Sequence, residues 1–169
     1  MSSRRIAGII LVASIAFFAS MRGGSAQVVA LGASATAGYG LSPSESFPAQ
    51  LQVMLQAKGS VTRVINAGVS GETSAQILAR VSSSVPEGTK TVILSMFMLN
   101  DRTHGVSPAA HQANVASIRQ RLGARGIRII DAAGLITSAA RAGMLQRDRI
   151  HLTAEGNRRV AAGLMASVR

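Results

Sequence analysis

From residue 28 onward, short apolar runs alternate with longer stretches in which apolar residues recur every three or four positions. The short runs are rich in Val and Ile, as buried strands are, whereas the longer stretches have the period of an amphipathic helix. Strands that alternate with helices favour a parallel sheet with helices on both faces, so the predicted fold class is α/β. The four predicted strands are residues 28–31, 61–65, 91–96 and 127–131.

Caps and prolines mark where the helices between these strands begin. Pro48 suits the first turn of one helix, and Ser107 with Pro108 supplies a cap and a first-turn proline to a longer one. Thr153 can cap the last helix. Further helical segments are expected at residues 74–81 and 133–144.

Polar segments, two of them rich in glycine, follow the first three predicted strands. They are residues 32–40, 66–73 and 100–101. The carboxyl ends of parallel strands meet at one edge of the sheet, where α/β proteins place their sites, so these segments are expected to come together there. The loop that carries Asp148 and His151 could join them at the same edge.

Residues 1–26 have the three parts of a secretory signal peptide. A short basic start precedes an apolar run at residues 6–20, and small residues suited to cleavage precede Gln27. The run is shorter than the about 20 residues that a membrane-spanning helix needs, and an uncleaved anchor is the alternative. We therefore expect one domain at residues 27–169, located in the periplasm or secreted, or held at the membrane if the leader is retained.

Charge and aromatic content bear on the partners of the chain. The formal net charge is +11, and aromatic residues make up only 3% of the sequence. The basic residues are scattered and almost no aromatic surface is available for stacking bases, so no nucleic-acid partner is expected. A solvated, arginine-rich surface is the favoured interpretation, and contact with an anionic membrane or cell-wall surface is the alternative.

The sequence gives little support to metal or thiol chemistry. It contains no cysteine, which excludes disulfides and cysteine-based metal sites. Its three histidines lack the paired spacing of a zinc site, so no metal is expected. His104 and His111 are interpreted as surface residues.

The residues for acyl transfer are present at the expected edge of the sheet. This chemistry needs a nucleophile, a base, a group that orients the base, and donors for the developing oxyanion. Ser34 lies in a tight turn after the first strand and can be the nucleophile, with His151 as base and Asp148 as its orienting partner. The candidate oxyanion donors are the Ser34 and Gly68 backbone N–H groups and the Asn100 side-chain amide.

Four short segments carry a family resemblance: Gly32-x-Ser34, Asn66-Ala67-Gly68, Asn100-Asp101 and Asp148-x-x-His151. In their order and spacing they resemble the four blocks of the SGNH (GDSL-type) hydrolases. The resemblance implies a three-layer α/β/α sandwich with a flavodoxin-like parallel sheet and no required cofactor. It implies that Ser34 is the nucleophile of a triad completed by His151 and Asp148. Gly68 and Asn100 are implied to complete the oxyanion hole.

The same resemblance indicates the class of reaction. Members of the family hydrolyse carboxylic esters, and some act on thioesters, lysophospholipids or acetylated sugars. The most similar branch contains small secreted arylesterases and enzymes like acyl-CoA thioesterase I, also called lysophospholipase L1. We expect a serine hydrolase for small-molecule or lipid esters or thioesters with short to medium acyl chains. The alternatives are an O-acetyl esterase acting on cell-wall or extracellular polysaccharide, and a non-catalytic binding module on the same scaffold.

The sequence departs from the family pattern in three places. Ala33 replaces the aspartate that usually precedes the serine, which removes a side chain that could support the first turn. Met98 and Leu99 stand where the family has glycine, so if that position needs a positive φ, either Met98 is strained or the loop differs. The short span from Asp131 to Asp148 leaves no room for a further strand. We therefore expect a sheet trimmed to four strands and a shallow, open acyl site.

Overall fold

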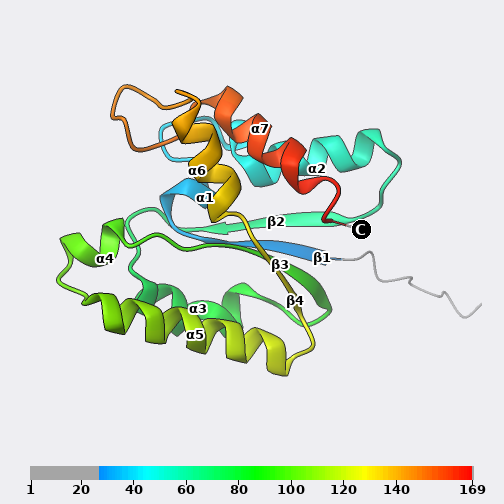
Figure 1. Cartoon of the computed structure of the whole chain (residues 1–169). Helices are drawn as coiled ribbons and strands as arrows, with labels where there is room; N and C mark the ends of the chain where they lie inside the picture. Colours follow the sequence, from blue (N-terminus) through cyan, green and yellow to red (C-terminus); the bar gives the residue numbers. More distant parts are fainter. Residues whose placement is uncertain (1–26, 169) are drawn as a thin grey trace, which may run out of the picture.

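Four parallel strands form the centre of the computed structural model, which describes residues 27–168 (Figure 1). The expected signal segment lies outside the described residues. The strands are β1 (Gln27–Gly32), β2 (Arg63–Gly68), β3 (Thr89–Ser95) and β4 (Arg128–Asp131), and their order in the sheet is β2-β1-β3-β4. The α/β class and the trimmed, four-stranded sheet are thereby confirmed.

Helices cover both faces of this sheet, so the molecule has three layers (Figure 1). One face carries α2 (Phe47–Ala57), α6 (Ala133–Arg141) and α7 (Ala154–Leu164). The other face carries α3 (Ser74–Ser84) and α5 (Pro108–Ala124). Three short elements complete the fold: α1 (Ser34–Ala37), the 3-10 helix η1 (Pro43–Glu45) and α4 (Leu99–Thr103).

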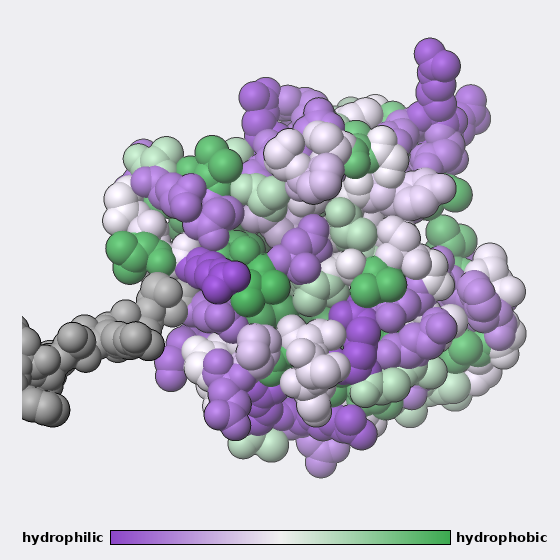
Figure 2. Space-filling model, turned by 180° about the vertical axis from the view of Figure 1, so that it is seen from behind, coloured by the Kyte–Doolittle hydropathy of each residue, from purple (hydrophilic) through white to green (hydrophobic). Residues whose placement is uncertain are grey.

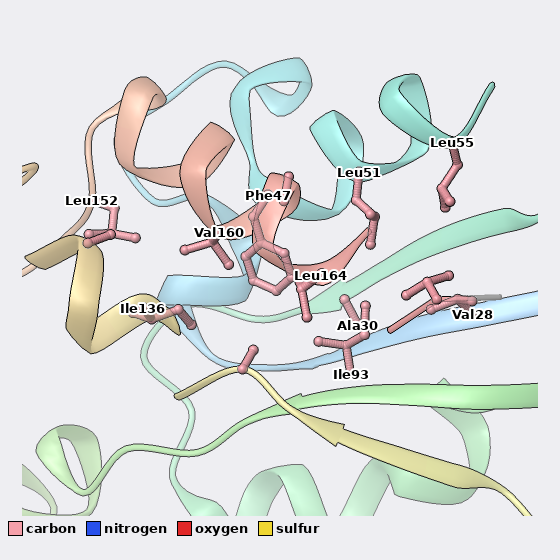
Figure 3. Close-up of a cluster of buried hydrophobic side chains, with 14 residues drawn as sticks. Val28, Ala30, Phe47, Leu51, Leu55, Ile93, Ile136, Leu152, Val160 and Leu164 are labelled. Carbon is pink, nitrogen blue, oxygen red and sulfur yellow. The ribbon is translucent and has the colours of Figure 1, made fainter. Parts of the chain in front are cut away.

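Strand β1 divides the core into two halves because successive side chains of a strand point to opposite faces. Val28 and Ala30 pack with α2, α6 and α7, whereas Val29 and Leu31 pack with α3 and α5. None of these four side chains is more than 2% exposed. Figure 3 shows the first half, in which the fully buried Phe47 lies among aliphatic side chains from the strands and helices. Because aromatic residues are scarce, both halves of the core are filled mainly by aliphatic side chains.

The expected helix caps are formed. Ser107 Oγ accepts the Ala110 N–H at 3.1 Å at the start of α5, and Thr153 Oγ1 accepts the Gly156 N–H at 3.2 Å at the start of α7. Pro48 lies in the first turn of α2.

Strand β2 differs from its prediction. It runs from Arg63 to Gly68, whereas the sequence pattern placed a strand at 61–65 and a loop from Asn66 onward. Gly68 pairs with Gly32 of β1. The prediction was wrong because β2 is an edge strand, whose extent is set by backbone pairing with β1 and not by a continuous apolar run.

Strand β2 lies beside one edge of β1, and the chain then crosses over to place β3 beside the other edge of β1. Such a reversal opens a crevice at the carboxyl ends of the two flanking strands. In Figure 1, α1, α4 and the loop before α7 gather at this end of the sheet. The crevice between the ends of β1 and β3 is therefore where a site is expected.

Within residues 27–168, no helix is both long enough and apolar enough to cross a membrane.

Candidate active site

The turn after β1 presents Ser34 at the edge of the sheet, as the first residue of α1. The turn packs so closely that only glycine fits at position 32, since a Cβ there would lie 2.3 Å from Thr36 Oγ1 and 2.5 Å from Ser95 Oγ. These two buried hydroxyls are themselves hydrogen-bonded at 2.5 Å. The end of β3 thus braces the turn that carries the candidate nucleophile.

Ala33 does not disrupt this turn. Its carbonyl accepts the N–H groups of Thr36 at 3.1 Å and Ala37 at 2.9 Å. The backbone bonds, together with the Thr36–Ser95 pair, hold α1 without a side chain at position 33.

Asp148 and His151 form the orienting pair that the sequence predicted. His151 Nδ1 donates to Asp148 Oδ2 at 2.7 Å, while Asp148 Oδ1 accepts the backbone N–H groups of Ile150 at 2.9 Å and His151 at 3.0 Å. Because Nδ1 carries the proton, Nε2 of a neutral ring is left as an acceptor. The Tyr39 ring packs on the imidazole with centroids 4.6 Å apart.

These bonds change the acidity of Asp148. The hydrogen bond from the His151 side chain, followed by those from the two backbone N–H groups, lowers the pKa of Asp148 to about 2 from its usual 3.8. The carboxylate therefore stays ionised at neutral and mildly acidic pH and can stabilise an imidazolium at His151.

The loop that holds this pair is closed on itself. Leu145 and Leu152 form an antiparallel bridge, and the Gln146 N–H donates to the His151 carbonyl at 2.7 Å. Inside the loop, Arg149 has φ +57°, a left-handed conformation that disfavours residues with a Cβ.

Ser34 and His151 line the same cavity, which has a volume of about 220 Å³. Ser34 Oγ makes no hydrogen bond within residues 27–168, so it is available to the imidazole and to a substrate. Catalytic hydrogen bonds are often long in unliganded enzymes. The other lining residues are mostly apolar: Ala35, Phe97, Leu99, Ile136, Thr137, Ala140 and Ile150.

Asn100 lies in α4, directly after β3. Its Nδ2 donates to the Glu72 carbonyl at 2.8 Å, and among residues 27–168 its second amide hydrogen has no acceptor. Met98 has φ −77° and ψ −2°, an ordinary helical conformation. The expected strain at Met98 is therefore absent, because this segment turns directly into a helix where the family pattern has glycines.

Gly68 is not the free donor that was expected. It is the last residue of β2, and its N–H donates to Asn66 Oδ1 at 2.9 Å. A Cβ at this position would lie 2.2 Å from the Ala37 nitrogen, so close packing against α1 explains the glycine. The expectation was wrong because the N–H already has an acceptor.

Gly71, three residues further on, has the properties expected of Gly68. It has φ +84°, and no heavy atom lies within 4 Å of where its Cβ would be. Within the described chain its N–H donates no hydrogen bond. It immediately precedes Glu72, whose carbonyl binds Asn100. The sequence alone could not tell which of the two glycines follows the strand.

One pair beside the site was missed from the sequence. Asp101 is fully buried, its Oδ1 accepts the Ser74 N–H at 2.8 Å, and its Oδ2 is bonded to His111 Nδ1 of α5. Burial acts to raise the pKa of Asp101, and the bonds from His111 and Ser74 outweigh it, so the pKa lies below its usual value. The surface interpretation of His111 is wrong, since its side chain is only 12% exposed.

In residues 27–168, no group of three or more His, Asp or Glu side chains is placed to hold a metal ion.

Comparison with known proteins agrees with this geometry. The profile of the GDSL-like Lipase/Acylhydrolase family matches residues 30–162. Esterase TesA of Pseudomonas aeruginosa is 35% identical over 103 residues, which are 61% of this chain and 51% of that protein. Thioesterase 1/protease 1/lysophospholipase L1 of Escherichia coli is 36% identical over 90 residues, 53% of this chain and 42% of that protein. The chain thus spans about half the length of these relatives.

Solved structures show the same fold. A crystal structure of TesA superposes with a TM-score of 0.74 at 25% identity, covering 85% of this chain and 98% of that one. The SGNH-hydrolase family esterase AlinE4 gives a TM-score of 0.63 at 30% identity, covering 86% and 96%.

Proposed function

Because the chain belongs to the GDSL-like lipase/acylhydrolase family, we propose that it is a serine hydrolase that cleaves carboxylic ester or thioester bonds. The observation that carries the proposal is the shared cavity. It brings Ser34 of α1 together with a histidine whose Nδ1 is fixed by Asp148.

In the proposed reaction, Ser34 Oγ attacks the substrate carbonyl carbon while His151 Nε2 takes the hydroxyl proton. The resulting imidazolium is stabilised by Asp148 through the Nδ1 hydrogen bond. When the tetrahedral intermediate collapses, the carbon–oxygen or carbon–sulfur bond breaks, and His151 returns its proton to the leaving alcohol or thiol. Water, deprotonated by His151, then attacks the acyl-Ser34 carbonyl, which releases the carboxylic acid and restores the serine.

The oxyanion of each tetrahedral intermediate needs donors on the opposite side from the base. We assign this role to the Ser34 N–H, the free amide hydrogen of Asn100 and, in place of Gly68, the Gly71 N–H. The assignment of Gly71 is supported by its unengaged N–H and by the bond that ties the adjacent Glu72 to Asn100. Loss of one such donor typically costs about 2.7–4 kcal/mol of transition-state stabilisation.

The cavity supports substrates with short to medium acyl chains. It is small, about 220 Å³, and its wall is formed mainly by aliphatic side chains and Phe97. An apolar wall favours an acyl chain over a hydrated sugar, so the O-acetyl polysaccharide alternative has less support than small-molecule or lipid esters and thioesters.

The decisive test compares the chain with its Ser34→Ala variant. Hydrolysis of aryl acetate and aryl butyrate should fall by about 10³-fold or more in the variant, because the nucleophile is lost. A fluorophosphonate should label Ser34 in the parent chain and leave the variant unlabelled. Equal rates for the two proteins would refute the mechanism. Absence of labelling in a folded chain would instead favour a non-catalytic binding module.

We also propose that the protein acts in the periplasm or outside the cell. The support is the pattern of residues 1–26 and the excess of basic over acidic residues, which remains about +8 without Arg4, Arg5 and Arg22 and suits work near anionic envelope surfaces. Mass spectrometry of the exported protein should find Gln27 as its first residue. A retained leader would instead indicate an anchored enzyme.

A further inference from the structure

Exposed hydrophobic side chains gather at the edge of the sheet that carries the site. Seven large hydrophobic residues are exposed in the described chain, and five of them lie on segments at this edge. These five are between 40% and 54% exposed: Tyr39, Val69, Phe97, Leu99 and Ile150. We call them the apolar rim. Exposed apolar surface concentrated around a site marks a contact region, whereas scattered single residues do not.

The apolar rim is assembled from distant parts of the sequence. Tyr39 follows α1 and Val69 follows β2, Phe97 and Leu99 lie between β3 and the first turn of α4, and Ile150 lies in the loop before α7. Phe97, Leu99 and Ile150 also line the cavity shared by Ser34 and His151. Three rim residues therefore lie at the cavity, and a fourth, Tyr39, packs on His151 beside it.

The rest of the surface lacks such a concentration. Of the exposed large hydrophobic residues among 27–168, only Val53 and Val61 lie elsewhere, on α2 and just before β2. Figure 2 shows the face behind that of Figure 1, on which hydrophobic residues occur in small groups separated by hydrophilic ones.

Unbalanced positive charge accompanies the rim. Arg102 of α4 is exposed, as are Arg147 and Arg149 of the loop between Leu145 and Leu152, here called the catalytic loop. None of the three has a carboxylate partner within the described chain. The carboxylates that follow the strands or lie in the catalytic loop are already engaged, in the pairs Glu72–Arg80, Asp101–His111, Asp131–Arg119 and Asp148–His151. The edge therefore offers free arginines and carboxylates that are already satisfied.

We propose that this edge docks onto an anionic lipid surface, with the apolar rim in the interfacial layer and the three arginines on lipid phosphates. Apolar side chains flanked by cations are what binding in the plane of an anionic membrane requires. A hydrated anionic polysaccharide could attract the arginines but offers no apolar phase to the five rim residues. The orientation would align the cavity entrance with the lipid layer, so an acyl chain could enter without crossing water.

A single tryptophan can report this orientation, because the chain contains none. Val69→Trp places the reporter on the rim, outside the cavity and the catalytic groups, and Val61→Trp places a matched reporter at the opposite end of the sheet. The full chain should be mixed with vesicles of phosphatidylglycerol or phosphatidylcholine, with and without brominated acyl chains. We expect blue-shifted, bromine-quenched emission from Val69→Trp on phosphatidylglycerol alone, and unchanged emission from Val61→Trp.

Charge variants test the second half of the proposal. Arg102→Gln and Arg147→Gln should each weaken binding to phosphatidylglycerol about fivefold, whereas the exposed Arg121 and Arg159 can be changed to Gln as controls with no comparable loss. Urea denaturation of Val69→Trp and Val61→Trp, at the m-value of the parent chain, would show that the fold of both reporters is intact.

Three outcomes would overturn the proposal. The first is equal or stronger quenching of Val61→Trp, since β1 begins with Gln27 at that end and attachment through residues 1–26 would bring it to the lipid. The second is no quenching in either variant. The third is binding to an anionic polysaccharide without binding to vesicles. None of these readouts needs catalysis, so they remain informative if the Ser34→Ala test fails.

Discussion

At the scale of single residues, the loop that carries Asp148 and His151 combines two unusual features in adjacent positions. Asp148 is an exposed carboxylate whose acidity is set by bonds from within its own loop. Arg149 has a left-handed backbone conformation, which glycine adopts with less strain than residues that carry a Cβ. The first feature bears on catalysis and the second on stability, so they can be tested separately.

The lowered pKa of Asp148 keeps this carboxylate ionised at mildly acidic pH. Above pH 3.8, the usual pKa of an aspartate, Asp148 is ionised and its hydrogen-bonded pair with His151 is intact. Because the pKa of Asp148 is depressed, the pair is lost only as the pH falls toward about 2. Between about pH 4 and pH 8, Asp148 should therefore stay ionised and add no step of its own to the pH profile of kcat/KM. An acid-limb slope of two in a logarithmic plot of kcat/KM would show that Asp148 titrates in this range. Asp148→Asn should lower kcat by about 10²–10⁴-fold at every pH.

Among residues 27–168, Arg149 is the one non-glycine residue with a positive φ. Arg149→Gly should raise the free energy of unfolding by about 0.5–1 kcal/mol. Relief of about 1–2 kcal/mol of left-handed strain outweighs the about 0.5–1 kcal/mol that glycine loses through chain entropy. Urea denaturation at constant m-value would measure the gain. Arg147→Gly, at a position without positive φ, is the matched control and should lose stability.

At the scale of elements, two very short helices position the chemistry. Both α1 and α4 begin within a few residues of a strand end, and each is fastened by contacts from another element. Thr36 of α1 is bonded to Ser95 of β3, and Asp101 of α4 is bonded to His111 of α5. A helix of one or two turns has little stability of its own, so these contacts keep Ser34 and Asn100 in place.

His111 should therefore affect catalysis from a distance. His111→Ala leaves the buried carboxylate of Asp101 without its side-chain donor, which should cost about 1–3 kcal/mol of stability and loosen α4. We expect kcat to fall about 10-fold while KM changes little, because the proposed role of Asn100 is to bind the oxyanion of the transition state. His111→Gln, which keeps a donor, should recover part of the rate.

The control for this experiment is His104→Ala. The His104 ring also lies beside α4, with Nδ1 2.8 Å from the Asn100 carbonyl, but it is exposed. Equal kinetic losses in His104→Ala and His111→Ala would argue against a role for the buried pair.

At the scale of the whole molecule, hydrophobic pattern predicted the architecture and missed what depends on pairing between distant segments. The strands within the buried layer were found because apolar runs mark them, and the helix starts at Ser107 and Thr153 because caps are local. The extent of β2 depends on its partner β1, so the sequence placed Gly68 in a loop. The bond between Asp101 and His111 joins two helices and leaves no local signal.

The closed loop between Leu145 and Leu152 has a consequence for how such chains can diverge. The Leu145–Leu152 bridge and the Gln146–His151 backbone hydrogen bond close the loop locally. The geometry between Asp148 and His151 therefore does not depend on the length of chain before the loop. Insertions or deletions between β4 and this loop should therefore leave the Asp148–His151 pair intact. A four-stranded sheet is in this way compatible with the Asp148–His151 hydrogen bond.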